Sequence, residues 1–140
     1  MSEPREALKG KILKEMTVDY TDKLEKNFEL AKQFIRLTKE GKVEILVKDK
    51  VSRKEQILLY LIGKMYAKEA GLAETYEVGN TELMKELRIP RGSLFPRLME
   101  LREENKIRQI QREGKVYHSV HVNQIEEILR AVDKKVRSGS

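Results

Sequence analysis

The 140-residue sequence has no cysteine, which excludes a disulfide framework, a thiolate nucleophile and a zinc site built with sulfur. It also lacks a run of about 18 apolar residues, the length that a membrane-spanning helix requires. The charged N-terminus does not resemble a signal peptide, and no internal repeat or low-complexity tract is present. We therefore expect a soluble, cytoplasmic protein of one domain rather than a large multi-domain enzyme.

Charge is abundant. Asp, Glu, Lys and Arg make up 37% of the chain, while the 39% of apolar residues is enough for a folded core. Abundant Lys, Glu and Arg without cysteine is typical of proteins from hot environments and favours a thermophilic, archaeal source. The net charge is +6, and residues 90–122 hold the densest excess, with seven basic and four acidic residues. This segment is the first place to look for a polyanionic partner.

Residues 1–50 are predicted to form a helical extension that ends in a short strand. Apolar residues recur every three or four positions from Leu8 to Thr38, which predicts helix over residues 5–40. Asp19 and Thr21 are natural N-caps, so the helix has a possible break at 17–22. Gly41 is a plausible C-cap. Beyond it, alternating residues 43–47 predict a half-buried strand.

Residues 51–122 predict three helices followed by a hairpin. Ser52 and Glu55 form a capping box at the start of a core helix over 52–70. A short helix over 81–87 is expected next, capped by Asn80 or Thr81. A third helix over 93–105 is expected with Ser93 as its cap and Pro96 in its first turn, where a missing N–H costs no helical bond.

Two strand-like runs, 107–111 and 116–122, flank the turn 112–115, in which Gly114 can adopt positive φ. A final helix is expected from Asn123, with Glu126 at its capping-box position, followed by a frayed tail from Arg137. These residues, 123–140, complete the predicted organisation.

This order of elements resembles the winged-helix DNA-binding superfamily, particularly the small prokaryotic MarR-type regulators and their archaeal relatives. The similarity covers about residues 52–122 and is carried by Asn80–Leu87, Pro90–Leu94 and Leu101–Ile107. It implies a mainly α fold with a small β-hairpin wing, a winged helix-turn-helix with N- and C-terminal helical extensions. It also implies that the partner is double-stranded DNA and that the protein regulates transcription.

The resemblance places helix 93–105 in the DNA major groove and the wing, 108–117, on the backbone. Arginines at the start of the helix suit guanine or phosphate, and a hydroxyl at a helix N-terminus suits a phosphate oxygen. Cations on the wing suit the backbone or the minor groove. The implied DNA-binding residues are Arg91, Ser93, Phe95, Arg97, Arg108, Arg112 and Lys115.

Phe95 and Pro96 depart from the family pattern, because they stand where polar, base-contacting side chains are usual. An apolar pair there suits either thymine methyl groups or a protein partner. The alternative function is therefore a winged-helix protein-interaction module, or an architectural chromatin module without sequence-specific readout.

The apolar stripes of the two flanking segments exceed what a winged helix of about 70 residues needs. Such stripes either pack within the chain or pair with a second copy, and terminal helices commonly form the dimer in winged-helix regulators. We expect a homodimer that sets two recognition helices about 34 Å apart. Its predicted interface consists of Leu24, Phe28, Ala31, Ile35, Ile125, Ile128, Leu129 and Val132.

The residues do not predict an enzyme, a metal site or a cofactor. His118 and His121 lie three residues apart on a strand and therefore point to opposite faces, with no cysteine or carboxylate nearby to complete a site. Glu103 and Glu104 are expected to form an ion-paired helix end. Gly114-Lys115 lacks the spaced glycines of a phosphate loop. Tyr60 and Tyr66 are expected to cap the core.

Overall fold

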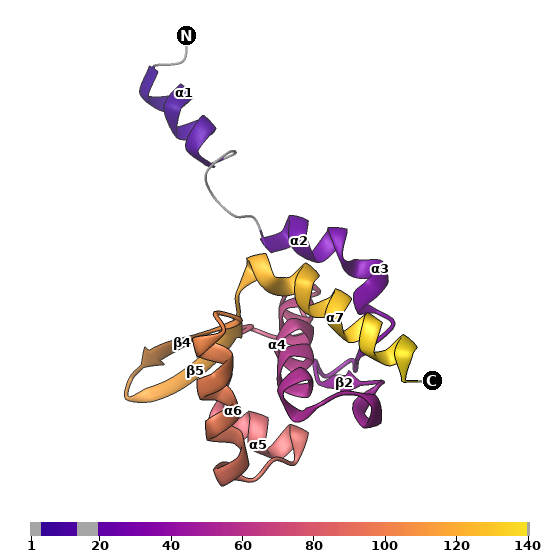
Figure 1. The fold of residues 1–140 in the computed structure, drawn as a ribbon. Coiled ribbons are helices and arrows are strands. Elements are labelled where there is room, and N and C mark those ends of the chain that lie inside the picture. Colours follow the sequence, from indigo (N-terminus) through magenta and orange to yellow (C-terminus); the bar gives the residue numbers. More distant parts are fainter. Residues whose placement is uncertain (1–3, 14–19, 140) are drawn as a thin grey trace.

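The computed structural model describes residues 4–13 and 20–139, and its described part is mainly helical with two small antiparallel sheets (Figure 1). The elements before the long central helix are α1 (Pro4–Lys11), α2 (Tyr20–Lys26), α3 (Phe28–Ala31), β1 (Ile35–Leu37) and β2 (Val43–Ile45). The elements from the central helix onward are α4 (Arg53–Glu69), β3 (Val78–Gly79), α5 (Asn80–Leu87), α6 (Arg91–Glu103), β4 (Ile107–Arg112), β5 (Lys115–Val120) and α7 (Ile125–Ser138). Short 3-10 turns precede α4 at Lys48–Lys50 and α7 at Val122–Gln124.

Helix α4 is the centre of the fold, and its residues 56–63 are all buried. Two groups of elements pack against it. We call α2, α3, β1, β2 and α7, with their connections (residues 20–50 and 122–138), the flanking side. We call β3, α5, α6, β4 and β5 (residues 78–120) the hairpin side. One continuous apolar core joins both sides through α4.

The capping box that begins α4 is confirmed. The Ser52 hydroxyl accepts a hydrogen bond from the Glu55 N–H at 3.2 Å, and the Ser52 N–H donates to a Glu55 carboxylate oxygen at 2.8 Å. Lys135 of α7 donates to the same carboxylate oxygen at 2.7 Å. Burial raises the pKa of Glu55, but the hydrogen bonds from Lys135 and Ser52 outweigh it and leave the pKa lowered. The cap therefore also ties α7 to α4.

The predicted helix through Thr38 is wrong at its C-terminal end. Residues 35–37 form strand β1, which pairs antiparallel with β2, and Ile35 lies opposite Ile45. The predicted strand over 43–47 is present as Val43–Ile45. Gly41 lies in the turn between these strands at φ +83°, so it does not cap a helix. Apolar residues at 34, 35 and 37 fit a helix as well as a strand, and the partner strand decides between them.

The predicted break at 17–22 lies partly outside the described residues, and helix α2 is described from Tyr20, so Thr21 lies inside that helix and does not cap it. Asp19 lies outside the described residues.

The flanking apolar stripes pack within one chain. Seven of the eight predicted interface residues are at most 7% exposed. They are Leu24, Ala31, Ile35, Ile125, Ile128, Leu129 and Val132. Only Phe28, 48% exposed, keeps a substantial surface. The seven buried side chains are therefore unavailable to a second copy while this packing holds, and a homodimer stays a prediction that needs another surface.

The hairpin side contains the predicted β-hairpin. Arg112 lies opposite Lys115, and the two residues between them, Glu113 and Gly114, have φ values of 50° and 77°. Positive φ at both central residues is the geometry of a tight type I′ hairpin turn. Strand β3 adds to the free edge of β5 and makes a sheet of order β3-β5-β4. The sequence does not predict this third strand, because two residues are too few to show a pattern.

Three predicted helix starts are wrong. Helix α5 follows Gly79 and α6 follows Pro90, both without a side-chain cap. Ser93 therefore lies inside α6, and Pro96 lies in its second turn, where its missing N–H leaves one helical bond unmade. Helix α7 begins at Ile125 after a 3-10 turn rather than at Asn123.

The predicted fraying of the C-terminal tail is also wrong as far as Ser138, because α7 continues to that residue. Arg137 pairs with Asp133 at 2.7 Å one helical turn earlier. Glu126, expected in a capping box, instead pairs with Arg130 at 2.8 Å and with Lys26 of α2 at 4.0 Å.

Candidate nucleic-acid interface

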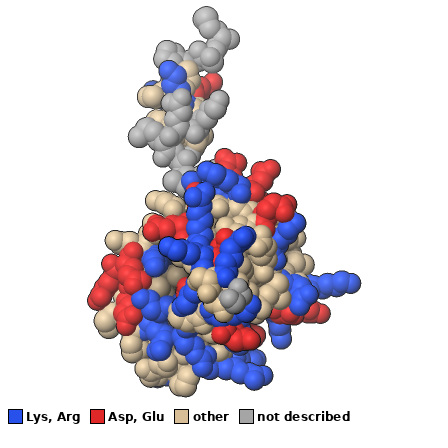
Figure 2. Space-filling view, turned by 45° about the vertical axis from the view of Figure 1, so that its right-hand side comes forward, with Lys and Arg blue, Asp and Glu red and all other residues tan. Residues whose placement is uncertain are grey.

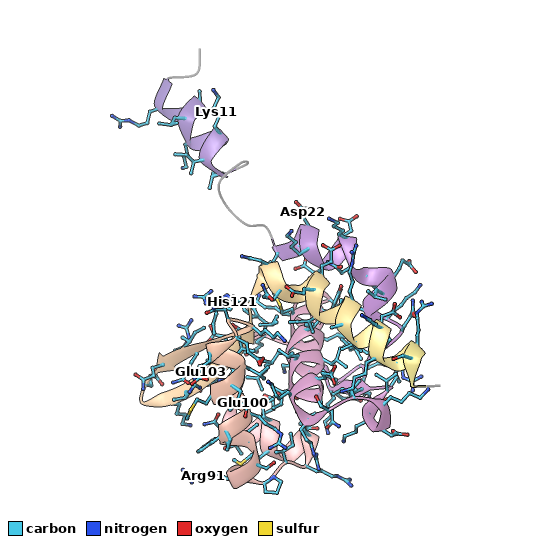
Figure 3. All side chains as sticks on the ribbon, viewed as in Figure 1. Lys11, Asp22, Arg91, Glu100, Glu103 and His121 are labelled. Atoms are coloured by element: carbon cyan, nitrogen blue, oxygen red, sulfur yellow. The ribbon has the colours of Figure 1, made fainter. Side chains whose placement is uncertain are left out.

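Helix α6 is fixed by its apolar face. Leu94, Leu98 and Leu101 are at most 2% exposed and face the core beneath α4. The opposite face, which includes Arg91, Pro96, Met99 and Glu103, is exposed. Figure 3 shows Arg91 at the free lower end of α6, with Glu100 and Glu103 further along toward its C-terminal end. The outward face is therefore basic at its start and acidic later.

Phe95 supports Arg91. The Arg91 guanidinium carbon lies 5.0 Å from the centroid of the Phe95 ring, within the range of a cation–π contact. Phe95 itself is half-buried and packs against the core. The apolar residue that departs from the winged-helix pattern thus orients the exposed arginine at the start of α6.

Ser93 and Arg97 satisfy one another. The Arg97 guanidinium donates to the Ser93 carbonyl and to the Ser93 hydroxyl, each at 2.8 Å. Both residues are half-buried. A phosphate contact by either side chain requires this local pair to open or to share its donors, so the predicted roles of Ser93 and Arg97 are weakened.

Arg112, predicted as a wing-tip contact, is held by Glu77. Two guanidinium nitrogens donate to the two Glu77 carboxylate oxygens at 2.8 Å each. This hydrogen bonding lowers the pKa of Glu77 and raises the pKa of Arg112. Glu77 comes just before β3, 35 positions away along the chain, so the sequence pattern gave no signal of the pair. Arg108 and Lys115 are exposed and form no direct ion pair among the described residues, although the charge of Arg108 also contributes to lowering the pKa of Glu77.

Two lysines of α4 neutralise carboxylates of α5 and α6. Lys54 pairs with Glu104 at 2.6 Å and with Glu100 at 3.2 Å, and Lys64 pairs with Glu82 at 3.3 Å. The hydrogen bond to Glu104 is the main cause that raises the pKa of Lys54. The expected ion pairing at the end of α6 is confirmed for Glu104.

After these ion pairs are counted, the hairpin side has more unpaired cations than unpaired carboxylates. Within the described residues, seven of its cations and three of its carboxylates have no ion-pair partner. The cations are Lys85, Arg88, Arg91, Arg97, Arg102, Arg108 and Lys115, and the carboxylates are Glu86, Glu103 and Glu113. Lys85, Arg88 and Arg102 were not among the predicted contacts. Basic and acidic side chains are mixed over the face seen in Figure 2. The unneutralised positive charge is therefore found from the ion pairs and not from the distribution of Lys and Arg alone.

His118 has a structural role in the sheet. It is 1% exposed, and its Nε2 lies 2.6 Å from the Asn80 side-chain oxygen. Burial lowers the pKa of His118 to about 4, with a smaller contribution from the positive charge of Arg102. Asn80, predicted as a helix cap, thus bonds a neutral histidine. No group of three or more His, Asp or Glu residues that could hold a metal ion occurs in the described ranges.

A groove of about 250 Å³ separates α6 from the hairpin. Phe95 and Met99 line it from α6, and Val116 and His118 line it from β5. Arg102 donates to the side-chain oxygen of Gln109 across one end of it. The lining is therefore mixed, and the buried Nδ1 of His118 has no hydrogen-bond partner among the described residues.

Tyr60 and Tyr66 cap the core as expected. The Tyr60 hydroxyl donates to Glu82 at 2.5 Å, and the Tyr66 hydroxyl donates to the Leu24 carbonyl at 2.6 Å. Burial is the main cause that raises the pKa of both phenols, and that of Tyr66 reaches about 12.

No protein-family model, curated protein or solved structure matches this chain. None of the helices in residues 4–13 and 20–139 combines the length and hydropathy needed to cross a bilayer.

Proposed function

We propose that this chain is a winged-helix protein that binds double-stranded DNA and regulates transcription in the cytoplasm. The element order α4-β3-α5-α6-β4-β5 supports the winged-helix assignment. The excess of cations without ion-pair partners on the hairpin side is the observation that carries the binding proposal. Free cations beside an exposed helix start provide the phosphate neutralisation that dominates affinity for duplex DNA.

In this proposal α6 approaches the major groove with its N-terminal end first. Arg91, held over the Phe95 ring, enters the major groove. Glu100 and Glu103, further along the helix, are repelled by the phosphates and remain outside the groove. Arg108 and Lys115 of the hairpin contact the backbone. Arg112 contributes less than a free arginine because Glu77 already satisfies it.

The test compares two triple variants that remove equal charge. One carries Arg91→Ala, Arg108→Ala and Lys115→Ala on the hairpin side. Its matched control carries Lys39→Ala, Lys48→Ala and Lys134→Ala on the flanking side, where all three lysines are exposed and lack a carboxylate partner among the described residues.

The measurement is duplex affinity as a function of salt concentration. Each lost phosphate contact makes the plot of log affinity against log salt concentration less steep by about 0.9. We therefore expect the slope to become shallower by up to about 2.7 in the first variant and to change little in the control. Equal slopes in the two variants, or no duplex affinity of the wild type at low salt, would contradict the proposal.

The alternative function, a winged-helix protein-interaction or architectural module, is favoured by one observation. Met99 is 53% exposed and lines the groove between α6 and the hairpin. Met99→Ser replaces the exposed apolar side chain by a small polar one and adds no charge beside α6. Loss of a salt-resistant protein complex, with only a small change in DNA affinity, would support the interaction module.

A further inference from the structure

An open apolar groove lies on the flanking side. Phe28 and Ala31 of α3, Ile35 and Leu37 of β1, and Tyr66 and Ala70 at the end of α4 line a hollow of about 250 Å³. The Tyr66 hydroxyl is satisfied by the Leu24 carbonyl at 2.6 Å. Lys32, the only charged residue of the lining, pairs with Glu29 at 2.7 Å and sits 5.4 Å from the Phe28 ring centroid. The groove therefore suits an apolar occupant.

Helix α1 exposes apolar side chains on one face. Leu8 of α1 and Ile12, which directly follows the helix, are 58% and 40% exposed, and Figure 1 shows α1 away from the rest of the chain. A helix of eight residues is marginal in water unless its apolar face packs against something. The helix and the groove thus both expose apolar surface that is not packed against another part of the chain.

Their charges are complementary. Helix α1 carries Arg5, Lys9 and Lys11 against the single carboxylate Glu6. Glu25, three positions before Phe28, and Glu69, directly before Ala70, are exposed and close in sequence to residues that line the groove. Neither carboxylate has an ion-pair partner within the described ranges.

The same chain can make the contact. Seven Cα-to-Cα steps separate Leu13 from Tyr20 and span at most about 25 Å. From Tyr20 the helical path to Phe28 adds about 12 Å. A tether this short gives a local concentration in the millimolar range, which favours the chain's own helix over that of a second molecule.

We propose that α1 of the same chain docks in this groove, with Leu8 and Ile12 against Phe28 and Tyr66 and its cations toward Glu25 and Glu69. The docked helix completes the flanking side as a further layer on α3, β1 and the end of α4. This inference is independent of DNA binding, and its failure leaves the proposed function unaffected.

The cysteine-free chain allows a direct test by site-specific cross-linking. One variant carries Ala7→Cys on α1 and Lys32→Cys at the groove. Its matched control carries Ala7→Cys with Lys85→Cys on α5, which is exposed on the hairpin side. Both are treated with a short bismaleimide at low protein concentration, and the products are resolved by mass.

We expect the first pair to cross-link within one chain about tenfold faster than the control pair or more, because docking raises the local concentration of the two thiols. Chain connectivity alone already favours the first pair, so the decisive comparison is within that pair: adding Leu8→Asp and Ile12→Asp should slow its cross-linking about tenfold, and Phe28→Asp should do the same from the groove side, whereas an unchanged rate overturns the proposal. Circular dichroism checks that these exposed substitutions preserve the fold. Equal rates for the two pairs overturn the proposal, and a predominant cross-linked dimer overturns it in favour of a second copy as the occupant.

Discussion

The flanking side and the hairpin side of α4 have the same formal charge but use it differently. The flanking side has twelve cations and nine carboxylates, and the hairpin side has nine and six, so each carries +3. On the flanking side six cations and five carboxylates lack ion-pair partners among the described residues. On the hairpin side the numbers are seven and three. Pairing, rather than composition, decides where free positive charge remains.

The two sides also differ in their apolar residues. The flanking helices bury their stripes against α4, and Leu129 and Val132 of α7 are fully buried. On the hairpin side α6 buries a narrower stripe and leaves Met99 53% exposed. Most of the flanking stripe therefore stabilises the fold, although Phe28 and Leu46 stay 48% and 43% exposed at its edge, whereas on the hairpin side the outward face of α6 itself keeps an apolar side chain exposed.

Leu129→Ala should have the largest effect, because it removes a fully buried side chain of α7 from the shared core. We expect the free energy of unfolding to fall by about 2–5 kcal/mol, as measured by urea denaturation. Met99→Ala on the exposed face of α6 is the control and should change it by less than about 0.5 kcal/mol. If Leu129→Ala instead dissociates a dimer and leaves unfolding unchanged, the stripe belongs to an intermolecular interface.

Acid should destabilise the hairpin side through His118. Burial lowers the pKa of His118 from 6.5 to about 4, so between these values the unfolded chain binds more protons than the folded one. The free energy of unfolding should therefore decrease as pH falls through this window, by about 3 kcal/mol in total from this residue.

The measurement is urea denaturation at several pH values between 6.5 and 4. His118→Gln should flatten the pH dependence relative to the wild type, whereas the half-buried His121, changed to Gln, should retain it. The same slope in His118→Gln as in the wild type would refute the assignment.

Lys54→Gln should weaken duplex binding although Lys54 itself is not expected to contact DNA. The change releases Glu100 and Glu104 from their shared partner and adds negative charge beside α6. We expect a decrease in affinity of less than about fivefold, measured at constant salt. The control, Lys68→Gln, removes an α4 lysine that has no ion-pair partner in the described residues. Equal effects of the two variants would show that only net charge matters.

Glu77→Gln should have the smallest effect, in the opposite direction. It frees Arg112 from its bidentate pair at the hairpin, so duplex affinity should rise by up to about threefold, and the salt slope should steepen. Glu113→Gln at the hairpin turn removes the same charge without releasing an arginine. An equal gain in both variants would attribute the effect to charge alone.

Local features of this fold could be predicted from the sequence. The Ser52 box and the turn at Glu113 and Gly114 depend on residues two or three positions apart, and both occur as predicted. The start of α6 was misplaced by two residues because Ser93 looks like a cap, while its hydroxyl accepts from Arg97 inside the helix. Among the predicted contacts, Arg91, Arg108 and Lys115 are exposed without a carboxylate partner among the described residues, whereas Arg112 is paired.

The central helix, the hairpin and the concentration of basic residues around them can be predicted from the amino-acid sequence, because their signals are periodicity, capping and turn chemistry within a few positions. Long-range contacts, by contrast, make residues 35–37 a strand, pack the flanking stripes within the chain and pair Glu77 with Arg112. Each of these depends on a partner distant in sequence or on a choice between two local conformations of similar free energy. Packing and pairing make that choice, and short-range patterns do not encode them.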